Sequence, residues 1–191
     1  MKSYYVHFLL FTFAFALLPC AIEAGQESNT SKAEYIGVVY YLTPSAKLQA
    51  LERRAPYPKT HLKALGFGGA RATVELDKEK ASLRLPSNQE LSFVVQLPDG
   101  IDPREFELYP FAVKNGKRQL EFSRGNVFSG LQLLLPIQIN ISRFGDGTYK
   151  ITPGSKLAVG EYAFMSRRSI DAFCFGVIKR NEDLNLKARR R

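Results

Sequence analysis

The chain has 191 residues, a formal net charge of +9 and 45% hydrophobic residues. These values are ordinary for one globular domain and exclude a disordered or low-complexity protein. Because the chain has only two histidines and two cysteines, it offers little material for a zinc site or a catalytic dyad.

The N-terminal segment, residues 1–24, has the features of a secretory signal peptide. Lys2 supplies a positive charge, residues 6–18 are almost entirely apolar, and Ala24 offers a small residue for cleavage. The apolar run is shorter than the about 20 residues that a membrane-spanning helix needs. No later segment is long and apolar enough to span a bilayer. We therefore expect export to the periplasm or the cell exterior, with a retained N-terminal anchor or a lipoprotein acylated at Cys20 as the alternatives.

After residue 24 the chain starts with a short polar stretch and continues as short β-type runs separated by turns. Residues 25–32 predict a flexible leader. From residue 33 onward, short β-type runs are separated by turn signals about every ten residues. Residues 35–42 are apolar on both faces and predict a central strand, whereas residues 47–54 fit either a short strand or one or two helical turns.

Alternating runs continue to the C-terminal region, at residues 71–76, 82–85, 91–97, 120–122, 131–135, 137–141, 149–151, 161–165 and 172–179. Between two runs, Asn115-Gly116 predicts a hairpin, because both residues tolerate the positive φ angles of a type I′ turn. Pro110 lies inside the run 106–113 and lacks a backbone N–H, so it predicts an edge strand or a bulge.

About nine or ten short strands without a sustained helical period predict an all-β fold. A single β-sandwich over residues 33–180 is the most economical architecture. Residues 181–191 form a basic tail that carries part of the positive charge.

A tyrosine near the C-terminus favours an immunoglobulin-like form of the sandwich. In such sandwiches a tyrosine near the start of the penultimate strand hydrogen-bonds back across the corner. Gly160 and Tyr162 fit that structural role, and the alternative is that Tyr162 is an ordinary strand aromatic.

Two C-terminal motifs, GEYAF at residues 160–164 and FCFGV at residues 173–177, resemble the signature of a group of exported bacterial proteins of unassigned function. Residues 51–53, 65–70 and 116–118 are also similar to the pattern of that group. The chain departs from the signature at Val159, where the group has proline. The resemblance implies bacterial export and a β-domain, and it implies no activity and no site.

Little in the sequence predicts catalysis, a metal or a cofactor. His61 and Cys174 are the only histidine and cysteine after residue 24. Cys174 lies between two phenylalanines, which predicts a buried structural thiol. Glu105 and Glu107 share one side of a strand-like run, which meets the simplest requirement of a glycosidase. A secreted hydrolase that uses such carboxylates, or Cys174 with His61, is therefore one alternative.

Basic residues give the main prediction of a binding site. Three pairs lie at or near predicted loops or strand ends: Arg53 and Arg54, Lys117 and Arg118, and Arg167 and Arg168. If these pairs converged in the fold, they would form a face that binds anions or an acidic partner.

We therefore predict a non-enzymatic envelope β-sandwich whose partner is a protein or an anionic envelope polymer. Export makes nucleic acid a less expected partner. A further alternative is a structural or assembly role, in which a sheet edge near Pro110 or the basic tail docks a partner strand.

Overall fold

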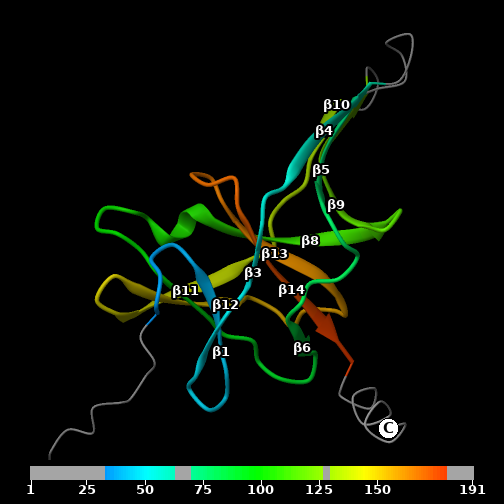
Figure 1. Cartoon of the computed structure of the whole chain (residues 1–191). Helices are drawn as coiled ribbons and strands as arrows, with labels where there is room; N and C mark the ends of the chain where they lie inside the picture. The colour runs from blue at the N-terminus through cyan, green and yellow to red at the C-terminus, as the bar shows by residue number, and fades with distance from the viewer. Residues whose placement is uncertain (1–32, 63–69, 127–129, 180–191) are drawn as a thin grey trace, which may run out of the picture.

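The computed structural model describes residues 33–62, 70–126 and 130–179 (Figure 1). The predicted signal peptide, leader and basic tail lie outside these ranges. Within them the chain forms fourteen β-strands and one short 3-10 turn, Pro103–Glu105, so the predicted all-β fold is confirmed. No helix in the described part of the chain is long and apolar enough to cross a membrane.

One sheet has five antiparallel strands in the order β11-β12-β7-β1-β2. Its strands are β1 (Val39–Leu42), β2 (Leu48–Ala50), β7 (Phe93–Gln96), β11 (Ile139–Gly145) and β12 (Thr148–Pro153). β1 lies inside this sheet, as the apolar character of residues 35–42 predicts.

The other sheet has nine strands, seven of them in the order β3-β14-β13-β8-β9-β5-β4. These are β3 (Glu52–Arg54), β4 (Tyr57–Leu62), β5 (Ala70–Leu76), β8 (Phe106–Lys114), β9 (Lys117–Asn126), β13 (Gly160–Ser166) and β14 (Ala172–Ile178). β6 (Arg84–Pro86) joins β14 in parallel, and β10 (Gly130–Leu133) joins β9.

The two sheets pack face to face over the main hydrophobic core, which makes the body of the molecule a β-sandwich. Alternate residues of each strand point inward, because side chains in a strand alternate between its faces. Phe93 from the five-stranded sheet meets Phe164 and Phe175 from the nine-stranded sheet, with ring centroids 4.9 Å and 4.8 Å apart. All three rings are completely buried.

Part of the nine-stranded sheet leaves the sandwich. Strands β4, β5, β9 and β10 project from the body, and we call them the arm (Figure 1). Where the arm joins the body, Leu76 and Leu120 form a second apolar cluster with Ala163 and Cys174. Both faces of β13 and β14 are therefore buried: one by the opposite sheet and the other by the base of the arm.

Two predicted local structures are confirmed. Lys114 and Lys117 pair across a turn in which Asn115 has φ of 51° and Gly116 has φ of 75°, as a type I′ hairpin requires. Tyr162 donates a hydrogen bond of 2.8 Å from its hydroxyl to the carbonyl of Ala158, the backward contact expected from a corner tyrosine. The immunoglobulin-like relation itself stays a prediction.

The edge position predicted for Pro110 is wrong, because β8 lies between β13 and β9. The proline is tolerated there because β9 pairs with β8 only from Ala112 onward. The carbonyl of Leu108 accepts a hydrogen bond from the backbone N–H of Ile137, on the side of β8 away from β13. Backbone groups two residues apart in a strand point the same way, so the ring nitrogen of Pro110 faces the side of β8 away from β13. No arm strand pairs with β8 at that position, so no hydrogen bond is lost there.

Two further sequence expectations are refined. Residues 47–54 form two short strands, β2 and β3, and no helical turn. The alternating leucines at residues 131–135 do not all enter the core, since Leu133 is 65% exposed and Leu135 is 79% exposed.

Candidate functional site

The three predicted basic pairs do not form one face. Neighbouring residues in a strand point to opposite sides. Accordingly Arg53 contacts Asp171 at 2.6 Å, whereas Arg54 turns to Glu52. The pair at the start of β9 also divides: Lys117 is exposed and Arg118 is 1% exposed.

One group of predicted residues meets at the end of the sandwich near the turn after β13. Arg53 and Arg168 both line a cavity of about 300 Å³ there. Each is matched by a carboxylate, since Arg168 lies 2.6 Å from Glu105. Arg167, in the same turn, donates to Glu107 at 3.1 Å. Each of these three arginines therefore has a carboxylate beside it, so the three add no unpaired positive charge among the described residues at this end.

A second group belongs to a buried ionic network that holds the loop between β5 and β6. Arg118 donates to the backbone carbonyls of Asp77 and Lys78, both at 3.1 Å. Glu52 accepts from the backbone N–H of Ser82 at 2.7 Å. Buried charges need such partners, because an unpaired charge away from water costs several kcal/mol.

Glu161 completes this network. It is 4% exposed, accepts from the backbone N–H of Ala81 at 2.8 Å, and forms an ion pair with Arg84. The Arg84 guanidinium lies over Gly176, where a side chain would collide with it. Arg54, Arg118 and their carboxylate partners therefore serve the fold.

Cys174 is buried, as predicted, and lies against this network. Burial raises the pKa of its thiol to about 12, although the nearby Arg118 acts to lower it. A thiol that stays protonated and inaccessible at neutral pH is a poor nucleophile. Its backbone pairs with Glu52 in β3, whereas His61 pairs with Arg71 on the arm. The arrangement gives the thiol version of the hydrolase no support.

The two carboxylates suggested for a hydrolase, Glu105 and Glu107, also form ion pairs with arginines. Glu105 closes the 3-10 turn rather than lying in the strand with Glu107. Burial acts to raise the pKa of Glu107, but hydrogen bonds from Tyr109 and Arg167 bring its pKa below the usual value. Glu107 is therefore held as a carboxylate. In the described ranges no cluster of three or more metal-ligating side chains is present.

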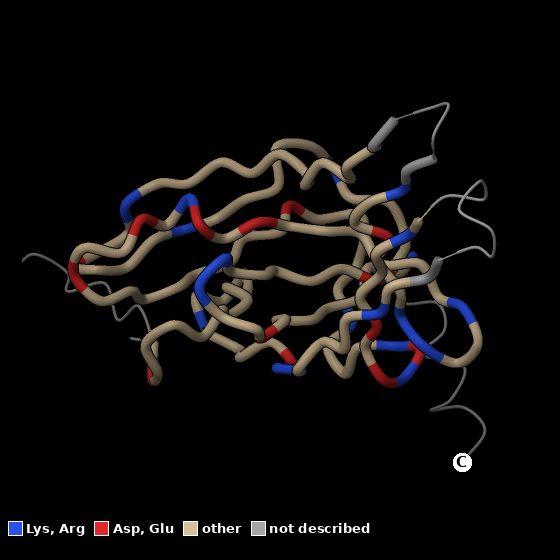
Figure 2. The backbone as a smooth tube through the Cα atoms, turned by 90° about the horizontal axis from the view of Figure 1, so that it is seen from above, with Lys and Arg blue, Asp and Glu red and all other residues tan. Residues whose placement is uncertain are grey.

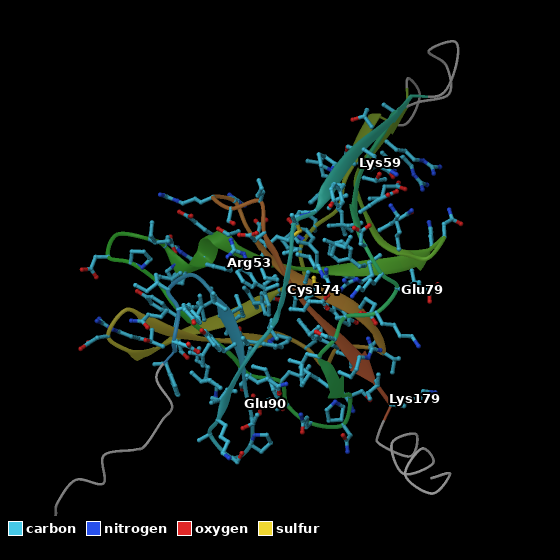
Figure 3. All side chains as sticks on the ribbon, viewed as in Figure 1. Arg53, Lys59, Glu79, Glu90, Cys174 and Lys179 are labelled. Atoms are coloured by element: carbon cyan, nitrogen blue, oxygen red, sulfur yellow. The ribbon has the colours of Figure 1, made fainter. Side chains whose placement is uncertain are left out.

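Cations outnumber carboxylates on one face of the arm. We call this the basic face; its cations are Lys59, Arg71, Lys117 and Arg124 on the arm, together with Lys114 at the end of β8, which pairs with Lys117. The carboxylates on the same face are Glu75, Asp77 and Glu121. Figure 2 shows Lys and Arg positions gathered on the side of the molecule where the arm lies, and Figure 3 places Lys59 far from Arg53.

The register of the arm explains why these side chains share a face. Lys59 pairs with Thr73, and Arg71 pairs with Arg124. Paired residues in adjacent strands lie on the same face of a sheet. A register shift between Ala72 and Thr73 adds one residue to β9, so Arg124 and Glu121, three residues apart, point to the same side.

Two of the three carboxylates, Glu75 and Glu121, lie beneath the cations and orient them, whereas Asp77 is exposed. Glu75, with its side chain 7% exposed, contacts Lys59 at 2.7 Å and Lys117 at 3.6 Å. The hydrogen bond from Lys59 is the largest cause that lowers the pKa of Glu75. Glu121 lies between Arg124 at 2.6 Å and Arg71 at 3.9 Å. The four cations that contact Glu75 or Glu121 keep 42–56% of their side chains exposed, which is more than either carboxylate. A partner that approaches this face therefore meets these positive charges before the two carboxylates.

No protein-family model matches the chain, and neither a curated protein nor a solved structure is significantly similar to it.

Sequence reasoning found only Lys117 of the basic face. Neighbouring basic pairs were the wrong pattern, because neighbours in a strand lie on opposite faces. The informative pattern is alternation, which places Arg71, Thr73 and Glu75 on one face of β5.

Proposed function

We propose that this chain is an exported, non-enzymatic β-sandwich of the bacterial envelope that binds an anionic polymer through the basic face of its arm. The observation that carries the proposal is the set of five exposed or half-exposed cations on one sheet face, where the carboxylates Glu75 and Glu121 are less exposed than the cations that they contact. The resemblance to exported bacterial proteins supports the compartment.

The layout of the charges favours an extended polymer over a small anion. Same-face residues in a strand are about 7 Å apart along the chain. Arg71 and Arg124 lie toward the tip of the arm, Lys59 one row nearer the body, and Lys114 and Lys117 at the base. One phosphate or sulfate reaches only one or two of these cations, whereas a linear polyanion laid along the arm reaches them all.

A charge-removal variant tests this proposal. Arg71→Gln combined with Lys114→Gln removes two cations and leaves buried Glu75 its partners, because Arg71 lies 3.9 Å from Glu121 and Lys114 is in no ion pair among the described residues. With each surface cation worth about 1 kcal/mol toward a polyanion, we expect about 30-fold weaker binding to dextran sulfate at low salt. The slope of log affinity against log salt should become shallower by about 2. Calorimetric titration at a series of salt concentrations measures both quantities.

The matched control removes the same charge from the five-stranded sheet side, with Lys47→Gln and Arg143→Gln. This control should bind within about threefold of the parent, because screening limits the reach of surface charges to about 10 Å. Equal losses in both variants would show that only net charge matters and would refute the assigned face. Binding to poly-glutamate but not to dextran sulfate would replace the polymer by an acidic protein partner, and neutral dextran should not bind.

A further inference from the structure

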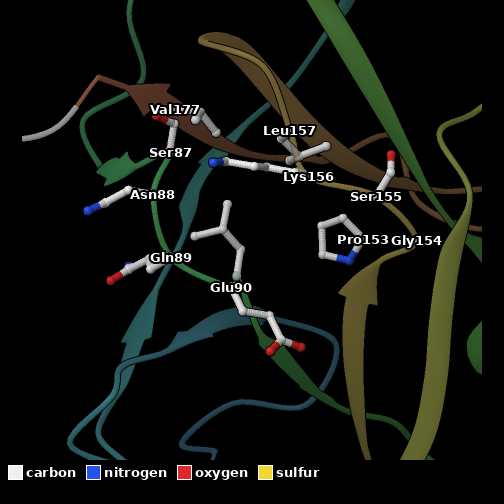
Figure 4. Close-up of a pocket in the computed structure, with 11 residues that line it drawn as sticks. Ser87, Asn88, Gln89, Glu90, Pro153, Gly154, Ser155, Lys156, Leu157 and Val177 are labelled. Atoms are coloured by element: carbon white, nitrogen blue, oxygen red, sulfur yellow. The ribbon is translucent and has the colours of Figure 1, made fainter.

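A cavity of about 360 Å³ opens at the end of the sandwich away from the arm (Figure 4). It lies between the loop that follows β6 and the loop that follows β12, and β14 contributes Val177. Figure 3 shows Glu90, one of its lining residues, at the opposite end of the molecule from Lys59 on the arm. The volume falls within the range of small-molecule sites.

The floor of the cavity is apolar. Leu91, Leu157 and Val177 line it, and all three are buried members of the main hydrophobic core. Pro153 adds a further apolar wall. A ligand that placed an apolar group here would cover side chains at the edge of the core, and burying that group would favour binding.

Two opposite charges flank this floor. Lys156 extends across one side of the cavity toward Ser87, and Glu90 lies on the opposite side (Figure 4). Neither Lys156 nor Glu90 forms a salt bridge with any described residue, in contrast to the arginines at the other end of the sandwich.

A neutral polar group lies beside these charges. The side-chain amide of Gln89 donates to the hydroxyl of Tyr41 at 2.5 Å. This bond ties the loop that follows β6 to β1, and the Gln89 side chain points away from Lys156 and Leu157 (Figure 4).

We propose that this cavity binds a short peptide with free termini and an apolar side chain. The ligand's ammonium group pairs with Glu90, its carboxylate pairs with Lys156, and its side chain rests on Leu91, Leu157 and Val177. A fatty acid would leave Glu90 facing an apolar chain, and a hydrophilic zwitterion would leave the floor exposed. The site is independent of the basic face of the arm.

Ligand series and matched variants test the proposal with leucyl-leucine as the probe. Titration followed by amide chemical shifts should show saturable changes at Leu91, Leu157 and Val177. The C-terminal amide and the N-acetyl derivative should each bind about 3- to 5-fold more weakly, because each lacks one charge that pairs with an exposed side chain, and glycyl-glycine should not saturate. Lys156→Gln should bind leucyl-leucine about 3- to 5-fold more weakly than the parent and should bind its C-terminal amide as tightly as the parent does. Glu90→Gln should likewise bind leucyl-leucine more weakly than the parent does and should bind the N-acetyl derivative as tightly as the parent does.

The controls are Lys47→Gln and Glu79→Gln, which remove exposed charges outside the cavity. They should leave the affinity unchanged. The proposal is overturned if leucyl-leucine shifts no cavity residue, if the blocked peptides bind as tightly as the free one, or if the controls lose as much affinity as the cavity variants. These ligand comparisons use the parent protein and so hold even if a variant folds poorly.

Discussion

Replacing Glu161 by alanine is expected to lower the free energy of unfolding by about 3–5 kcal/mol. The change removes the carboxylate that accepts from Ala81 and pairs with Arg84, and it leaves a half-buried guanidinium and a buried N–H without a partner. The loop between β5 and β6 then loses one of its anchors to the nine-stranded sheet. Chemical denaturation measures the loss.

A double-mutant cycle separates the ion pair from general damage. Arg84→Met combined with Glu161→Leu should cost clearly less than the two single changes added together, because the double variant leaves no buried charge unpaired. Glu79→Ala, in the exposed part of the same loop, should change stability by less than about 0.5 kcal/mol. A Glu161→Ala protein as stable as the parent would contradict the assigned network.

Replacing Phe93 by alanine should cost about 3–5 kcal/mol, because its ring joins the two sheets. The ring is 0% exposed and lies 6.0 Å from the ring of Tyr41, in addition to its contacts with Phe164 and Phe175. Thermal and denaturant unfolding measure the loss. Phe144→Ala is the matched control: Phe144 is 39% exposed on β11, so its removal should cost less than about 0.5 kcal/mol. Equal losses for the two variants would contradict the position of Phe93 between the sheets.

Local sequence patterns predicted much of the β-sandwich. Alternation at residues 91–97 predicted the strand β7, whose Phe93 and Val95 enter the main core, and Asn115-Gly116 predicted the turn because both residues adopt positive φ. Tyr162 makes the backward hydrogen bond that its place in the strand suggested. These features depend on residues close together in sequence.

The arm and the ionic network could not be predicted in this way. Glu161 meets Ala81 and Arg84 from about eighty positions away in the chain, and no local pattern selects which carboxylate faces which partner. Arg118 was assigned to a surface site because it follows Lys117. The pleat of β9 instead sends one side chain to water and the other into the protein.

We propose that the basic face of the arm, and not the arginine-rich end near Arg53, meets the partner. The most direct measurement is amide chemical-shift mapping of the parent protein with dextran sulfate at low salt. We predict that the largest changes fall on β4, β5 and β9, around Lys59, Arg71 and Arg124, and that they fade as salt is added. Changes centred on Arg53, Arg167 and Arg168 would contradict the account.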